Sequence, residues 1–202
     1  MFFQILGSTA GQAIRDAVNA SGEPPIPQLA DLFSDSDIDS SSTTEFWKLC
    51  SLREQFRSRY HAYWKSTSDL TACKRPVDGV IMPVAAHAAP PEGSFKYYAW
   101  TAIPSMLDYT AGSLPVTFAD RFTDHKVPHY NPMSSKDRTN WELYSKDVFD
   151  GSPVGVQVVG QRYQEEKVLA MMEAVKLALE AYSKNHLFQS TTTSQDGPIV
   201  LL

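Results

Sequence analysis

Hydrophobic residues recur at helical spacing in two long stretches of the chain. The first stretch begins at Ser42, which with Glu45 three residues further on matches a capping box. Its apolar positions are Phe46, Leu49, Phe56, Tyr60, Tyr63 and Trp64. The second stretch spans residues 164–184. Its apolar positions are Val168, Met171, Met172, Val175, Ala178, Leu179 and Tyr182. Both patterns predict long amphipathic helices that bury one stripe of side chains.

Three shorter apolar runs have the length of strands. The run at residues 80–83 predicts a buried strand that leads into a loop, and residues 114–118 predict a second short strand. Residues 154–160 are apolar except for Gln157, which is typical of a strand covered on both faces. Because this last strand is followed by a helix, the pattern indicates an α/β layer.

Two shorter helices are predicted between these elements. Residues 11–20 suit a short helix, which Gly22 and the prolines after it bring to an end. Residues 99–109 have helical character, with Pro104 as a kink or as a late start of the helix.

The remaining segments are polar. Aspartate and serine dominate residues 34–42, which predicts a flexible, solvated loop. Residues 120–150 form a polar excursion with one short helix over residues 141–148. We therefore expect residues 186–202 to be a disordered tail.

Composition indicates a folded protein and excludes several functions. Of 202 residues, 43% are hydrophobic and 20% are charged, so there is enough apolar material for a core. The formal net charge of -5 gives no electrostatic support for nucleic-acid binding. Two cysteines without a CxxC pair fit a reduced intracellular chain. There is no convincing signal peptide and no apolar run long enough to span a membrane, so we expect a cytoplasmic location.

Local groupings of reactive residues have simpler explanations than catalysis. His125 and His129 have the spacing of two metal ligands on one helical face, but Pro128 disfavours that helix and no third ligand is near. Residues 134–136 combine serine and lysine in a polar loop, which favours a surface turn. Asp78 begins a strand beside a glycine, where a turn or cap role is the plainer interpretation. No metal site is predicted.

Three ordered blocks resemble amidase-signature enzymes. They are PVDGVIMPV at residues 76–84 with HAAP at 87–90, LDYTAGSLPVT at 107–117, and DGSPVGVQVVG at 150–160 followed by QEE at 164–166 and VL at 168–169. The last block resembles the closing strand and helix of the family. Residues 11–27 are similar to the acetamidase or general-amidase branch, so the resemblance covers nearly the whole chain before Asn185. It implies that residues 1–185 form a partial amidase-signature domain, the C-terminal portion.

The resemblance implies a fold and a mechanism. The fold class is α/β, here the C-terminal part of a mixed sheet wrapped by helices. The family hydrolyses carboxylic amides with a nucleophilic serine, a second serine in a cis peptide and a lysine, while backbone amides of a Gly/Ser-rich loop hold the oxyanion. This chemistry needs no cofactor, and its substrate is a small-molecule amide.

The family places the lysine and the Gly/Ser-rich loop upstream of the matched blocks. Ser40–Ser42 is flanked by acidic residues and lacks glycine, so it cannot replace that loop. We therefore assign no catalytic residue in this chain and expect a fragment that is inactive alone. The alternative is a non-catalytic binding or interaction protein derived from an amidase, which docks a partner or self-associates through an exposed sheet edge.

Strand ends are where ligands lie in α/β sheets, which identifies candidate pocket-wall positions. They are Pro83, His87, Trp100, Ile103 and Thr117. The family resemblance does not assign these positions a catalytic role.

Overall fold

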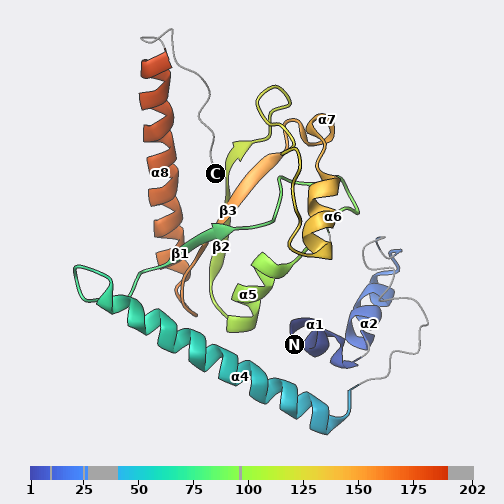
Figure 1. The fold of residues 1–202 in the computed structure, drawn as a ribbon. Coiled ribbons are helices and arrows are strands. Elements are labelled where there is room, and N and C mark those ends of the chain that lie inside the picture. The colour runs from blue at the N-terminus through green and yellow to red at the C-terminus, as the bar shows by residue number, and fades with distance from the viewer. Residues whose placement is uncertain (10, 25, 27–40, 96, 191–202) are drawn as a thin grey trace.

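Helices accompany a small antiparallel sheet in the computed structural model, which describes residues 1–9, 11–24, 26, 41–95 and 97–190. In chain order the elements are α1 (Phe2–Leu6), the 3-10 helix η1 (Gly7–Thr9), α2 (Gln12–Ser21), α4 (Thr43–Ser66), the 3-10 helix η3 (Thr67–Asp69), β1 (Val80–Pro83), α5 (Ala99–Leu107), β2 (Ala111–Phe118), α6 (Ser135–Leu143), α7 (Lys146–Phe149), β3 (Pro153–Val159) and α8 (Glu165–Ser190). Figure 1 shows α8 on one side of the sheet and α5 and α6 on the other, with α4 extending beneath them towards α1 and α2.

Strand β3 is the centre of the sheet. It pairs antiparallel with β1 on one side and with β2 on the other, so the strand order is β1-β3-β2. Gln157 of β3 lies opposite Met82 of β1 and Ser113 of β2. These three residues therefore share one face of the sheet, because directly opposite residues point the same way.

Helix α8 covers the other face of the sheet. Gly112 and Gly160 lie under it, and a Cβ on Gly160 would lie only 2.7 Å from Val168 Cγ2. Val168 is buried, as the helical pattern predicts, but Ala178 and Tyr182 at the far end of the predicted stripe are exposed. The helix continues to Ser190. The rest of the expected tail, residues 191–202, lies outside the described residues.

Strand β1 differs from its prediction. The apolar run predicts a buried strand, but Ile81 is 58% exposed and burial alternates along the strand. Ile81 lies opposite Val158, on the face that carries α8, but α8 packs mainly over β2 and β3 and leaves this edge strand open. Strand β3 holds the central place, and its C-terminal residues Gln157, Val158 and Val159 are buried, as predicted for a strand covered on both faces.

The capping box before α4 is confirmed. The Ser42 hydroxyl accepts a hydrogen bond from the Glu45 N–H at 3.3 Å, and the Glu45 carboxylate accepts from the Ser42 N–H at 2.9 Å. Hydrogen bonds from the Ser42 hydroxyl and from the Ser42 N–H lower the pKa of the Glu45 carboxyl. The predicted apolar stripe is only partly buried, since Trp64 is 4% exposed while Tyr63 is 68% exposed. Residues 34–40 of the predicted Asp/Ser loop lie outside the described residues.

The two short helices differ in how well the sequence predicts them. Residues 12–21 form α2 as expected, and α5 runs through Pro104 instead of beginning there.

The single helix predicted over residues 141–148 is wrong, because the structure has two helices there: α6 starts earlier, and α7 follows it. The Ser134 hydroxyl accepts from the Asp137 N–H at 3.2 Å, so the residues interpreted as a surface turn are a helix cap.

Candidate substrate-binding site

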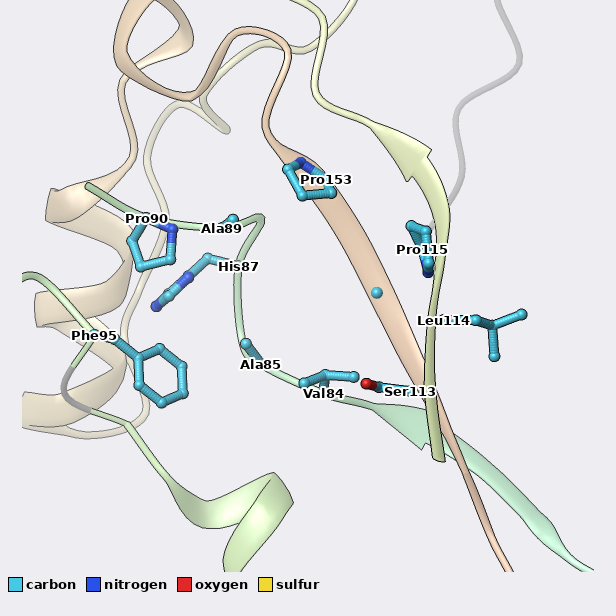
Figure 2. Close-up of a pocket in the computed structure, with 11 residues that line it drawn as sticks. Val84, Ala85, His87, Ala89, Pro90, Phe95, Ser113, Leu114, Pro115 and Pro153 are labelled. Carbon is cyan, nitrogen blue, oxygen red and sulfur yellow. The ribbon is translucent and has the colours of Figure 1, made fainter. Parts of the chain in front are cut away.

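An apolar cavity of about 400 Å³ lies between the segment after β1 and the middle of β2 (Figure 2). Its walls come from Val84, Ala85, His87, Ala89, Pro90, Phe95, Ser113, Leu114, Pro115, Pro153 and Gly155. Backbone hydrogen bonds hold the segment after β1 against β3, because the Val84 N–H donates to the Gly155 carbonyl and the Ala89 N–H donates to the Pro153 carbonyl. We call this space the apolar cavity.

His87 forms part of the apolar cavity, as the sequence suggested for a residue after the strand end. Its Nδ1 lies 2.8 Å from the Ala88 carbonyl oxygen, and a carbonyl can only accept, so Nδ1 is the protonated nitrogen. The ring meets Phe95 and Phe149 edge-on, at centroid distances of 5.8 and 6.1 Å. Its Nε2 is buried and has no hydrogen-bond partner among the described residues. His87 therefore supplies a wall of the cavity and contacts no nucleophile there.

Gln157 joins two predicted pocket positions that the sequence could not connect. Its Nε2 donates to the Pro83 carbonyl at 2.8 Å and to the Trp100 carbonyl at 3.0 Å. Pro104 explains why the Trp100 carbonyl needs this partner, since proline lacks the N–H that would bond to it one helical turn back. The buried glutamine, 4% exposed, thus ties the end of β1 to α5. The only sequence signal for it is one polar residue in an apolar strand.

Replacing Gln157 with leucine is expected to lower the free energy of unfolding by about 2–3 kcal/mol, because two backbone carbonyls lose their donors. Urea denaturation followed by circular dichroism measures the change. Gln55→Leu, at an exposed position of α4, is the matched control and should stay within about 0.5 kcal/mol of the parent chain. Equal effects of the two substitutions would contradict the role assigned to Gln157.

A second cavity of about 290 Å³ lies beside the Gln157 side chain. It is lined by Val84, Thr101, Pro104, Ser105, Tyr109, Ala111, Gly112, Ser113 and Gln157. Val84 and Ser113 also line the apolar cavity, so the two spaces are neighbours. We call this second space the polar cavity, because hydroxyl and amide side chains contribute to its walls.

Of the five predicted pocket-wall residues, His87 alone lines one of these two cavities. Ile103 is half-buried in α5, and Thr117 is exposed near the end of β2, opposite Val154. Pro83 and Trp100 are also absent from the cavity walls, but their carbonyls accept hydrogen bonds from Gln157, which lines the polar cavity.

Charged residues near the sheet have structural partners. Asp78 lies 2.6 Å from Lys167 and 4.0 Å from Arg75, and the hydrogen bond to Lys167 lowers the pKa of Asp78. The pKa of Asp150 is lowered by hydrogen bonds from the backbone and side chain of Arg121. Both carboxyl groups stay ionised and join loops to neighbouring elements instead of carrying a proton.

The remaining sequence candidates offer no reactive cluster. His125 and His129 are exposed, and within the described ranges no group of three histidine, cysteine or acidic residues could hold a metal ion. Cys50 and Cys73 are free. No helix in the described part of the chain is long and apolar enough to cross a membrane.

Comparison with known proteins identifies the family. The family model described as Amidase matches residues 16–169, which is most of the chain. The chain belongs to the amidase family. It is 35% identical over 158 residues to an acetamidase of Aspergillus oryzae, covering 78% of this chain and 28% of that protein. It is 32% identical over 166 residues to an acetamidase of Emericella nidulans, covering 82% of this chain and 30% of that protein.

The fold comparison agrees with the family. A fatty acid amide hydrolase structure superposes with a TM-score of 0.71 at 23% sequence identity, over 86% of this amidase-family chain and 30% of that chain. This confirms the expected fold class, the helix-and-sheet fold of amidase-signature proteins. The chain spans about a third or less of the length of the relatives it matches.

Proposed function

We propose that this chain is the C-terminal part of an amidase-signature hydrolase that cleaves carboxylic amides. The observation that carries the proposal is its 35% identity to an acetamidase across most of its length. The apolar cavity supports it, because small-molecule sites are concave, mostly apolar and furnished with a few polar groups. In this role His87 helps to form the wall against which the acyl or aryl part of the amide lies, and the Pro83 and Trp100 carbonyls hold the neighbouring Gln157 side chain.

The proposal places the serine and lysine chemistry outside this chain. Serine attack needs a hydroxyl within hydrogen-bond reach of its base. Among the described residues, no serine hydroxyl has a hydrogen bond to a lysine, and Ser134, the serine beside Lys136, caps a helix. Ile103 and Thr117 are proposed as further substrate contacts in the complete enzyme.

The proposal also places the protein in the cytoplasm, which the two free cysteines support.

Two assays test this function. The purified chain should show no hydrolysis of acetamide or benzamide above the buffer rate, since the proposal places the nucleophile outside it. A chimaera in which this chain replaces the aligned segment of the Aspergillus oryzae acetamidase should hydrolyse acetamide. The intact acetamidase is the positive control, and the same enzyme without the segment is the negative control.

The outcomes separate the alternatives. Hydrolysis by the purified chain would show that catalytic residues lie within it. A folded but inactive chimaera would instead favour the second candidate, a non-catalytic interaction protein derived from an amidase. That candidate is favoured by one observation, the exposed apolar side chains Ile81 and Phe118 on the two outer strands, which are 58% and 62% exposed.

A further inference from the structure

A cleft of about 210 Å³ lies where the end of α4, the segment before β1 and the start of α8 meet (Figure 1). We call it the basic cleft, because Lys65 of α4, Arg75 of the segment before β1 and Lys167 of α8 all line it, together with His61. Among its described wall residues, Asp78 is the one acid. We propose that the basic cleft binds a phosphate group, as inorganic phosphate or as the end of a small phosphomonoester.

The charges that line the basic cleft do not cancel. Lys167 Nζ lies 2.6 Å from Asp78 Oδ1, and the Arg75 guanidinium approaches the same oxygen at 4.0 Å. Two cations therefore share one carboxylate, and within the described ranges no acidic side chain forms an ion pair with Lys65. The wall thus has a net positive charge, although the formal net charge of the whole chain is -5. An anion that enters the cleft offsets the repulsion among these cations.

Hydrogen bonds hold the segment that carries Arg75 against the end of α4. The Trp64 indole N–H donates to the Val77 carbonyl at 3.0 Å, and the Val77 N–H donates to the Thr67 hydroxyl at 3.0 Å. Trp64 is itself buried and lines the cleft. The backbone of the wall is therefore fixed before a ligand binds, which lowers the entropy cost of binding.

A phosphate group matches the donors of the basic cleft. The Arg75 guanidinium can donate two parallel hydrogen bonds to phosphate oxygens, while the ammonium groups of Lys65 and Lys167 act as point charges beside it. A carboxylate has only two oxygens and one charge, so it would satisfy fewer of these donors. The small volume of the cleft and the acidity of the whole chain argue against a nucleic acid as the ligand.

The basic cleft shares no wall residue with the apolar cavity or the polar cavity. Phosphate binding therefore goes beyond the proposed amide hydrolysis, and neither result depends on the other. An active chimaera with no phosphate binding would refute the phosphate site alone. Phosphate binding together with a folded, inactive chimaera would refute the hydrolase function alone.

Nuclear magnetic resonance of the 15N-labelled chain tests the proposal with sodium phosphate and glycerol 3-phosphate as probes, at constant ionic strength. The Trp64 indole N–H resonance is the reporter, because Trp64 lines the cleft, and its absence from the spectrum of the Trp64→Phe variant assigns it. Phosphate should shift this resonance in a saturable way, with a dissociation constant on the order of 1 mM. Tighter binding of glycerol 3-phosphate would identify a phosphomonoester as the ligand, and weaker binding would identify free phosphate.

Two lysine variants of α4 locate the binding. Lys65→Ala removes an exposed cation of the cleft that has no ion pair within the described ranges, so the fold should persist while phosphate binds about fivefold more weakly. Lys48→Ala, at an exposed position of the same helix outside the cleft, makes the same change of net charge and should bind phosphate like the parent chain.

Three results would each overturn the proposal. The first is the lack of a saturable shift with either phosphate probe. The second is an equal shift of the Trp64 resonance with sodium chloride, which would show a general effect of salt. The third is an equal loss of affinity in Lys65→Ala and Lys48→Ala, which would show that phosphate responds only to the net charge of the chain.

Discussion

Replacing Phe149 with alanine is expected to lower the free energy of unfolding by about 3–5 kcal/mol, the usual cost of removing a buried aromatic side chain. Phe149 is 1% exposed at the end of α7. Its ring meets His87 at a centroid distance of 6.1 Å and Tyr144 at 5.7 Å. It therefore supports the wall of the apolar cavity from behind, and its loss leaves a void that rigid neighbours fill only in part.

Urea denaturation of the parent chain and the variant measures this effect, with both fluorescence and circular dichroism as probes. Val148→Ala is the matched control, because Val148 is the preceding residue and is 55% exposed. It should change the free energy of unfolding by no more than about 0.5 kcal/mol. A Phe149→Ala midpoint equal to that of the control would show that α7 does not pack as described.

Replacing Trp64 with alanine is expected to destabilise the chain by a similar amount, about 3–5 kcal/mol. Trp64 is 4% exposed, and its ring is perpendicular to that of Tyr109 at 5.6 Å. Its indole N–H also donates to the Val77 carbonyl at 3.0 Å. The side chain thus joins the end of α4 to the segment that leads into β1, and the substitution removes packing and a hydrogen bond together.

Two further variants separate these contributions. Trp64→Phe keeps most of the packing and loses the donor, so it should cost about 1 kcal/mol for the hydrogen bond plus a smaller packing loss. Tyr63→Ala is the control for the effect of an alanine substitution on helix α4, because Tyr63 is the preceding residue and is 68% exposed. If Tyr63→Ala proved as damaging as Trp64→Ala, the buried face of α4 would be assigned wrongly. Equilibrium urea curves measure all three variants.

The helices that the sequence predicts best are those with strong local signals. The capping box of Ser42 and Glu45 marks the start of α4, and Val168 belongs to a helical stripe that is buried where it faces the sheet. The spacing of apolar residues fails to predict burial where a side chain is buried by a distant segment of the chain. Tyr63 fits the stripe as well as Trp64 does, yet only Trp64 meets a neighbouring segment. Nothing in the spacing of apolar residues distinguishes the two.

In the candidate site, too, the sequence indicates some residues and only the packed structure reveals others. Position after a strand end is enough to indicate Pro83 and His87, and the structure places both near the cavities. Gln157 is missed, because a glutamine in an apolar run has no local signature of the contacts it makes. Its hydrogen bonds to the Pro83 and Trp100 carbonyls depend on how β3 packs against β1 and α5.

By itself, the sequence determines the family, the main helices and strands, and the composition of a folded acidic chain, since these follow from residue order and short-range spacing. Pro104 is also visible in the sequence as a residue that cannot satisfy the Trp100 carbonyl. Only the tertiary structure decides that Gln157, from the central strand, supplies the missing donor at 3.0 Å. The physical reason is that hydrogen bonds between distant segments depend on how the chain packs, and local propensity contains no information about that packing.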